Sequence, residues 1–271
     1  MLTQILQPHP PGSGIELTDA LAVPPAGLPK HDAMDRALTD QETRLGELQA
    51  ALGAEGRRAL LVVLQGRDAS GKDGLVRKVF GGLNPALCSV TSFKRPSTLE
   101  LKHDYLWRVH QAIPPRGTIG IFNRSHYEDV IAVRVHRLVA ESVWRKRFDQ
   151  INAFEAMLSD EGIVIRKFFL HISKDEQRER LEERLSDPTK NWKFEAADLD
   201  ERRLWDDYTA AYEEALERCS TAQAPWYVVP ADKNKPRDYL IAEVLIRTLE
   251  LMNPQYPAAD PAVLGLAGKI E

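Results

Sequence analysis

The sequence has few cysteines and no long hydrophobic run. Its 271 residues include two cysteines, Cys88 and Cys219, which lack the spacing of a disulfide framework or a zinc site. The longest aliphatic run, residues 59–64, is far too short to cross a bilayer. The first residues also lack the basic start and apolar stretch of a secretory signal. These absences predict a cytoplasmic protein without a membrane segment or a structural zinc ion.

Charge is unevenly distributed along the chain. The whole sequence has 36 basic and 40 acidic residues, a net charge of −4. Residues 66–146 hold 14 basic and 7 acidic residues, so this block carries +7 while the remainder carries −11. A basic block inside an acidic chain predicts a polyanionic ligand, whereas accidental clustering of surface charge would give the same count.

Strand-like and helical patterns alternate along the chain. Five short runs have the pattern of strands: residues 59–64, 88–93, 118–122, 163–172 and 226–229. Seven segments have the pattern of helices: residues 32–52, 72–80, 98–113, 143–158, 174–185, 197–219 and 238–251. This alternation predicts an α/β fold, with a central parallel sheet of about five strands flanked by helices.

Prolines mark the amino-terminal end of the predicted domain. Six of them fall within residues 1–30, which predicts an extended arm that either wraps the domain or hangs free. Residues 31–255 are predicted to form one domain with a helical insertion near residues 175–219, and residues 256–271 a carboxyl-terminal tail.

Residues 66–72 read Gly-Arg-Asp-Ala-Ser-Gly-Lys, a G-x-x-x-x-G-K motif between a predicted strand and a predicted helix. Glycines let consecutive backbone N–H groups turn toward phosphate oxygens, and the helix amino terminus and Lys72 add positive charge. A glycine-rich turn with an exposed lysine is the alternative, but the strand–loop–helix context favours a phosphate loop. Its predicted phosphate ligands are Gly66, Arg67, Ala69, Ser70, Gly71, Lys72 and Asp73.

Two carboxylates make this loop unusual. Asp73 replaces the Ser or Thr that normally follows the lysine and holds Mg²⁺. Asp68 lies inside the loop, where a carboxylate repels phosphate unless a metal ion or an arginine lies between them. Asp68 is therefore the predicted ligand of Mg²⁺, for which Mn²⁺ is a substitute. Asp73 is a weaker metal candidate, because an acidic residue in the first turn of a helix is favoured by the helix dipole.

A second group of polar residues follows the third predicted strand. Residues 122–129 read Phe-Asn-Arg-Ser-His-Tyr-Glu-Asp, which places Arg124 where it reaches a transferring phosphate with two N–H groups. Glu128 or Asp129 offers a carboxylate that Asn123 lacks, so Glu128 is the predicted second metal ligand. A lone histidine such as His126 is more often structural than catalytic. The predicted nucleotide ligands are Asn123, His126, Tyr127 and Glu128.

Further cations lie near the predicted site. Lys94 and Arg95 follow the second predicted strand, where an acceptor phosphate binds in nucleotide kinases, although a solvated loop has the same composition. Most charges of the helical insertion fit exposed, salt-bridged helices. Its polar turn, residues 187–193, also fits a mobile lid over phosphates, with Lys190 and Lys193 as phosphate ligands.

Five segments, in this order, resemble the polyphosphate kinase 2 family, and most closely its class III branch: residues 66–74, 93–108, 119–129, 187–194 and 224–232. The resemblance implies a thymidylate-kinase-like P-loop fold with a helical lid. It also implies reversible, Mg²⁺-dependent transfer of the terminal phosphoryl group of inorganic polyphosphate to AMP and ADP. Adenine nucleotides are the implied partners, with guanine nucleotides as an alternative, and the implied assembly is a homo-oligomer, either a dimer or a tetramer.

The resemblance also assigns roles to single residues. The family's loop aspartate and lysine fall on Asp68 and Lys72, and its strand-end arginine falls on Arg124. These three are the predicted catalytic residues. The lid arginines fall on Arg178, Arg180 or Arg184, which are predicted to bind polyphosphate. Other branches have aspartate in place of Asn123, and residues 232–236 lack an expected aromatic residue.

Two rival functions remain open on the sequence. An ATP-dependent nucleoside or nucleotide kinase would share the fold. A non-catalytic polyphosphate or nucleic-acid binder would explain the basic block, but the helical segments lack an interleaved aromatic surface and a binder does not need Asp68. We therefore expect no nucleic-acid partner and no membrane partner. We also expect in-line transfer without a phosphoenzyme.

Overall fold

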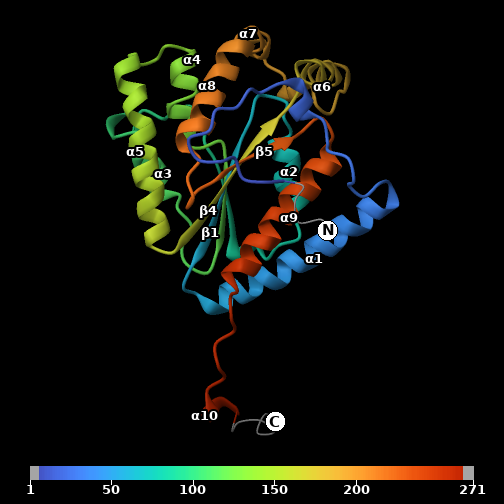
Figure 1. Ribbon diagram of the computed structural model, residues 1–271, viewed down its shortest axis with the longest axis vertical. Helices are drawn as coiled ribbons and strands as arrows, with labels where there is room; N and C mark the ends of the chain where they lie inside the picture. The colour runs from blue at the N-terminus through green and yellow to red at the C-terminus, as the bar shows by residue number, and fades with distance from the viewer. Residues whose placement is uncertain (1–5, 265–271) are drawn as a thin grey trace.

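Five parallel strands form the centre of the molecule in the computed structural model, which describes residues 6–264 (Figure 1). They are β1 (Ala59–Gln65), β2 (Cys88–Ser92), β3 (Ile119–Asn123), β4 (Ile163–His171) and β5 (Trp226–Pro230). Their spatial order is β2-β3-β1-β4-β5, and every neighbouring pair is parallel. The sheet confirms the predicted α/β P-loop kinase fold.

Strand β1 lies in the middle of the sheet and is buried along its whole length. Leu64 pairs with Asn123 of β3 on one side and with Phe168 of β4 on the other. The order of the strands reverses here, because β3 and β4 lie on opposite sides of β1. In parallel α/β sheets the ligand crevice lies at such a point, beyond the carboxyl ends of the strands. The loop that follows β1 therefore opens into the expected ligand position.

Helices cover both faces of the sheet (Figure 1). One face carries α1 (Asp32–Glu55), α2 (Lys72–Val79) and α9 (Asn234–Met252), which pack through a leucine-rich core. The other carries α3 (Trp107–Gln111), α5 (Glu141–Asp160) and α8 (Trp205–Cys219), whose core is rich in aromatic residues. The two faces account for the unbroken apolar sequence of β1, since its side chains enter both cores.

The remaining helices are short or belong to the insertion. The α-helices are α4 (Ala132–Val135), α6 (Lys174–Ser186), α7 (Ala197–Arg203) and α10 (Pro261–Leu264). The 3₁₀ helices are η1 (Asp19–Ala22), η2 (Pro85–Leu87), η3 (Glu100–Lys102), η4 (His126–Asp129) and η5 (Asn191–Lys193). Helices α6 and α7 lie at the top of Figure 1, beyond the end to which the arrow of β4 points. No helix of the described residues is long and apolar enough to span a membrane.

Two predicted helices are wrong in extent. Residues 98–113 form only η3 and α3, because nearby side chains bind the backbone in turns. The Ser97 N–H donates to Glu100 Oε2 at 2.6 Å, and the Leu106 N–H donates to Asp104 Oδ1 at 3.0 Å. Residues 197–219 form α7 and α8, which are separated at Leu204.

The amino-terminal arm wraps the domain over the part that the structure describes. The His9 N–H donates to the Trp226 carbonyl at 2.7 Å, and the Leu17 N–H donates to Glu213 Oε1 at 2.8 Å. The Thr18 carbonyl contacts His171 Nε2 at 2.9 Å. The arm thus crosses β5, α8 and the end of β4, and it is held to each of them through a backbone N–H or carbonyl group.

Candidate active site

The phosphate loop connects β1 to α2 and curls tightly. Ala69 and Gly71 have φ angles of 63° and 93°, in the left-handed region. A Cβ at Gly71 would lie 2.0 Å from Arg237 Nη1, so both the φ angle and the packing require glycine there. The loop therefore turns back on itself, and within it the Ser70 N–H donates to the Arg67 carbonyl at 3.2 Å.

Lys72 lies beneath this loop and is 8% exposed. Its Nζ donates to the Gly66 carbonyl at 2.6 Å and to the Arg67 carbonyl at 3.2 Å. Burial, together with the nearby Arg124 guanidinium, lowers the pKa of Lys72 to about 8. The ammonium is thus positioned by the loop itself and still mostly charged at pH 7.

Arg124 and Asp68 form an ion pair at the mouth of the loop. The Arg124 backbone has a φ of 61°, and its N–H donates to the Leu64 carbonyl at 2.9 Å, which fixes it beside β1. Its Nη2 lies 2.5 Å from Asp68 Oδ1, and its Nη1 lies 3.4 Å from Glu128 Oε2. The Glu128 carboxylate, with a further contribution from Asp68, raises the pKa of Arg124. The structure therefore brings Asp68, Lys72, Arg124 and Glu128 together.

Asn123 and Asp73 lie at the same edge. Asn123 Nδ2 donates to Asp73 Oδ1 at 2.8 Å, which links the end of β3 to the first turn of α2. Lys94 and Arg95 are exposed in the segment after β2, the strand next to β3. The Lys94 carbonyl accepts a hydrogen bond from Arg108 Nη1 at 2.8 Å, so its backbone is held while its side chain stays at the surface.

His126 and Tyr127 lie away from the site. Their side chains are 1% and 0% exposed and are enclosed in the core that faces α5. The Tyr127 hydroxyl donates to Glu155 Oε1 at 3.0 Å, and Lys167 Nζ lies 2.5 Å from Glu155 Oε2. The expectation that His126 and Tyr127 contact the nucleotide is corrected, because the turn after β3 folds both rings inward onto this buried ion pair.

The side chain of Arg67 also points elsewhere. Its guanidinium lies 4.0 Å from the centre of the Trp205 ring and donates to the Thr209 hydroxyl, both on α8. Burial lowers its pKa to about 10. The side chain thus fastens the loop to α8, so a role for Arg67 in phosphate binding depends on its backbone N–H.

Cations of the insertion are paired with neighbouring groups. Arg180 Nη1 donates to the Ala69 carbonyl at 2.9 Å, and its Nη2 donates to the Ala231 carbonyl at 2.7 Å. The other pairs are Arg178 with Asp175 at 3.6 Å, Arg184 with Asp198 at 4.0 Å and Lys190 with Glu183 at 2.6 Å. The side chain of Lys193 lies outside the part of the chain that the structure describes. Arg180 therefore supports the phosphate loop from outside.

Two residues contact the phosphate loop although no sequence motif near the loop indicates them. Gln177 of α6 donates from Nε2 to the Asp68 carbonyl at 3.0 Å. Arg237 of α9 is 1% exposed and donates from Nη1 to the Ser70 carbonyl at 3.2 Å. A buried arginine beside a glycine-rich loop is apparent only once the fold brings α9 under the loop.

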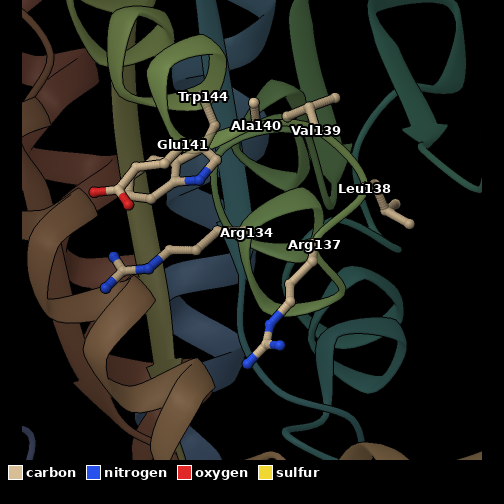
Figure 2. A pocket seen from close by; sticks show the side chains of 7 residues that line it. All are labelled: Arg134, Arg137, Leu138, Val139, Ala140, Glu141 and Trp144. Carbon is tan, nitrogen blue, oxygen red and sulfur yellow. The ribbon is translucent and has the colours of Figure 1, made fainter.

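A surface pocket of about 510 Å³ lies between α4 and the start of α5 (Figure 2). Its lining residues are Arg134, Arg137, Leu138, Val139, Ala140, Glu141 and Trp144. Arg134 is engaged in packing, since its Nη1 lies 2.7 Å from Glu214 Oε2 and its guanidinium lies 4.9 Å from the centre of the Trp144 ring. No residue predicted for the site lines this pocket.

Comparisons with known proteins find similar sequences over most of the chain. A family model described as polyphosphate kinase 2 matches residues 29–257. The AMP/ADP-polyphosphate phosphotransferase of Meiothermus ruber is 56% identical over 226 residues, 83% of this chain and 85% of that protein. The ADP-polyphosphate phosphotransferase of Rhodopseudomonas palustris is 46% identical over 237 residues, 83% of this chain and 82% of that protein.

A solved structure is similar over nearly the whole chain. The crystal structure of polyphosphate kinase 2 from Arthrobacter aurescens TC1 matches with a TM-score of 0.84 and 36% identity. The match covers 97% of this chain and 99% of that chain. The overall fold is therefore shared with that protein.

Proposed function

The chain belongs to the polyphosphate kinase 2 family, and from this premise we propose that it transfers the terminal phosphoryl group of inorganic polyphosphate to AMP and ADP, reversibly. The observation that carries the proposal is the convergence of Lys72, Asp68 and Arg124 at the phosphate loop. The names of the relatives support the substrates, since one of them is an AMP/ADP-polyphosphate phosphotransferase. A relative from Corynebacterium glutamicum, named as a GDP-polyphosphate phosphotransferase, supports testing guanine nucleotides as well.

Charge neutralisation is the first task of such a site, because both substrates are polyanions. Lys72 is mostly protonated at pH 7, since its pKa is about 8. Arg124 stays charged, because Glu128 and Asp68 raise its pKa. The backbone N–H groups of the loop add further positive ends of dipoles. These groups together hold the phosphate that moves and the phosphate that accepts it.

The donor set fits Mg²⁺. No cluster of three or more His, Cys, Asp or Glu side chains suited to a metal occurs within residues 6–264. Mg²⁺ commonly takes one or two carboxylates and completes its octahedron with phosphate oxygens and water. Asp68, whose side chain is 31% exposed, would hold the ion, and Glu128 is the second candidate. When bound, the ion would neutralise phosphate charge, and Mn²⁺ would serve in the same way.

The acceptor oxygen needs no strong base, because a nucleotide phosphate is already ionised at neutral pH. Phosphoryl transfer passes through a loose transition state, so positioning and charge stabilisation dominate the rate. Lys72 and Arg124 would stabilise the phosphoryl group in flight. Transfer would be direct and in line, without a phosphoenzyme.

A donor comparison tests the proposal. Purified protein is given AMP and Mg²⁺ with either polyphosphate or ATP, and the formation of ADP is followed. We expect ADP with polyphosphate, then ATP as ADP is itself phosphorylated. Activity with ATP alone would identify an ATP-dependent kinase, and binding without turnover would identify a polyanion-binding protein. Either result would overturn the proposal. Repeating the assay with ADP, GMP and GDP as acceptors measures the base preference.

The assembly and location are part of the same proposal. The family resemblance supports a homo-oligomer of two or four chains that acts in the cytoplasm. Light scattering of the purified protein measures its mass against the 30.6 kDa of one chain. A monomer at micromolar concentration would contradict this part of the proposal.

A further inference from the structure

Three consecutive carbonyl groups of the phosphate loop accept hydrogen bonds from distant helices. The Asp68 carbonyl accepts from Gln177, the Ala69 carbonyl from Arg180, and the Ser70 carbonyl from Arg237. In a planar trans peptide the carbonyl and the following N–H point in opposite directions. Holding these three carbonyls therefore fixes the directions of the next three N–H groups. These are the N–H groups of Ala69, Ser70 and Gly71, of which that of Ser70 donates to the Arg67 carbonyl at 3.2 Å within the loop.

Gln177 differs from the other two donors because it also contacts α7. The Gln177 Oε1 accepts a hydrogen bond from Arg202 Nη1 at 2.9 Å. Arg202 Nη1 also donates to the Lys174 carbonyl at 2.7 Å. The Gln177 residue is 4% exposed, and both ends of its amide are used. The reversed amide would place its NH₂ against the guanidinium and its oxygen against the Asp68 carbonyl. Arg202 thus selects the orientation in which Gln177 donates to the loop.

We propose that Gln177 is a positioning residue that couples helix α7 to the phosphate loop through Arg202. With Arg202 in place, the amide is fixed and the Asp68 backbone is held where its carboxylate meets Arg124. Without Arg202, the buried amide loses the group that sets its orientation. The coupling rests on the proposed function, because the loop that it positions is the one that holds the transferring phosphate.

A second contact joins the same two parts of the molecule. Arg67 lies over the Trp205 ring and donates to the Trp205 carbonyl at 3.4 Å, at the first residue of α8. Only Leu204 separates α8 from α7. The loop is therefore fastened to the insertion on either side of the α7–α8 junction. A displacement of α7 reaches the loop through contacts that the structure shows.

A double-mutant cycle tests the coupling. The variants are Gln177→Met, Arg202→Met and the double variant, with Arg203→Met as the matched control. Arg203 lies on the same helix, is exposed and pairs with the exposed Asp200 at 2.6 Å. We expect each single variant to lower kcat by about 10- to 100-fold, because a misplaced phosphate loop loses near-attack geometry. The double variant loses no more than Gln177→Met alone, and Arg203→Met stays within about twofold of wild type.

Gln177→Glu tests the donor and the acceptor of the Gln177 amide separately. The glutamate keeps an acceptor for Arg202 but has no donor for the Asp68 carbonyl. We expect it to lower kcat as Gln177→Met does, whereas a residue that merely anchors α7 would tolerate this change. Thermal unfolding of each variant reports whether the fold is intact. The coupling would be overturned if the fold-losses in kcat of the two single variants multiply in the double variant. Full activity of Gln177→Glu would overturn it as well.

Hydrogen exchange supplies a measurement that does not depend on turnover. Amide exchange across residues 66–72 is followed in the protein without substrate. We expect faster exchange in Gln177→Met and in Arg202→Met, and wild-type exchange in Arg203→Met. Unchanged exchange in Arg202→Met contradicts the coupling. A wild-type protein that transfers no phosphate from polyphosphate contradicts the proposed function, and exchange still decides the coupling.

Discussion

At the scale of single residues, the site concentrates charge within a few ångströms of one loop. Asp68 and Arg124 meet at 2.5 Å, and Lys72 lies under the loop that carries Asp68. The loop carbonyls of Gly66 and Arg67 hold Lys72, and Asp68 holds Arg124, so the protein itself positions both cations. This preorganisation is the reason to expect large effects from single substitutions here.

We expect Asp68→Asn and Lys72→Ala each to lower kcat by about 10²–10³-fold. Asp68→Asn removes the carboxylate charge that we assign to Mg²⁺ while keeping the shape of the side chain. Lys72→Ala removes the ammonium that we assign to the transferring phosphoryl group. Steady-state rates with AMP and polyphosphate at saturating Mg²⁺ measure both effects. Near-normal turnover in both variants would remove these residues from the mechanism.

Lys72 also sets a pH dependence. We propose that its charged form binds phosphate, and burial lowers its pKa to about 8. We therefore expect kcat/KM for polyphosphate to fall about tenfold per pH unit above 8, since the free enzyme loses the proton there. Raising the pH has the opposite effect on folding stability, which it increases. The cost of keeping this ammonium buried is fully present below pH 8 and is relieved as pH rises from 8 toward the ordinary value of 10.5. A flat kcat/KM profile between pH 7 and 9.5 would contradict the assignment.

At the scale of elements, the sequence predicts correctly those strands, loops and helices whose residues are adjacent in the chain. The run before Gly66 is a strand, the loop follows it, and α2 begins at Lys72, so the loop was predicted from one stretch of chain. Gln177 and Arg237 reach the loop from α6 and α9, and no pattern near residue 70 indicates them. The sequence places His126 in the site because it lies two residues after Arg124, but η4 turns its side chain into the core.

The turn after β3 depends on a buried ion pair between two elements. Lys167 of β4 is 0% exposed and binds Glu155 of α5, the Tyr127 hydroxyl at 2.7 Å and the Cys219 carbonyl at 2.6 Å. These contacts hold η4, which begins two residues after Arg124. Residues that look like surface charges in the sequence therefore fix the position of a residue in the site.

Lys167→Met is expected to lower the free energy of unfolding by about 3–5 kcal/mol, because it leaves the Glu155 carboxylate buried without its lysine partner. The double variant Lys167→Met with Glu155→Leu removes the stranded charge as well, so it should recover part of that loss. Urea denaturation followed by circular dichroism measures both. A loss below about 1 kcal/mol in Lys167→Met would show that Glu155 does not depend on this lysine.

At the scale of the whole molecule, the basic block is only partly directed at a ligand. Arg134 and Arg145 both pair with Glu214 of α8, and Arg116 pairs with Glu161. Acidic residues from outside the block thus neutralise some of the +7 counted over residues 66–146. The sequence count indicated a polyanion, but the fold determines that Lys72 and Arg124 are the cations at the phosphate loop.

The amino-terminal arm ties distant parts of the molecule together. Besides its contacts with β5, α8 and β4, the Ala22 carbonyl accepts from the Asp232 N–H at 3.2 Å. Asp232 Oδ1 in turn accepts from the Ser173 N–H at 2.8 Å, at the start of α6. The arm therefore supports the carboxyl end of β4, after which the insertion begins.

Deletion of residues 2–23 tests how much the arm contributes to stability. Leu17 and Ala22 are buried, at 8% and 0% exposure, and the arm's hydrogen bonds to the domain are lost with them. We expect a loss of about 2–4 kcal/mol after the ordering entropy of the arm is recovered, which lowers Tm by about 5–15 °C. Truncation after Gln255 is the matched control, because the described residues beyond it are exposed. Calorimetry should show a lower Tm for the arm deletion alone. An equal shift in both truncations, or no shift in either, would mean that the arm only lies on the surface.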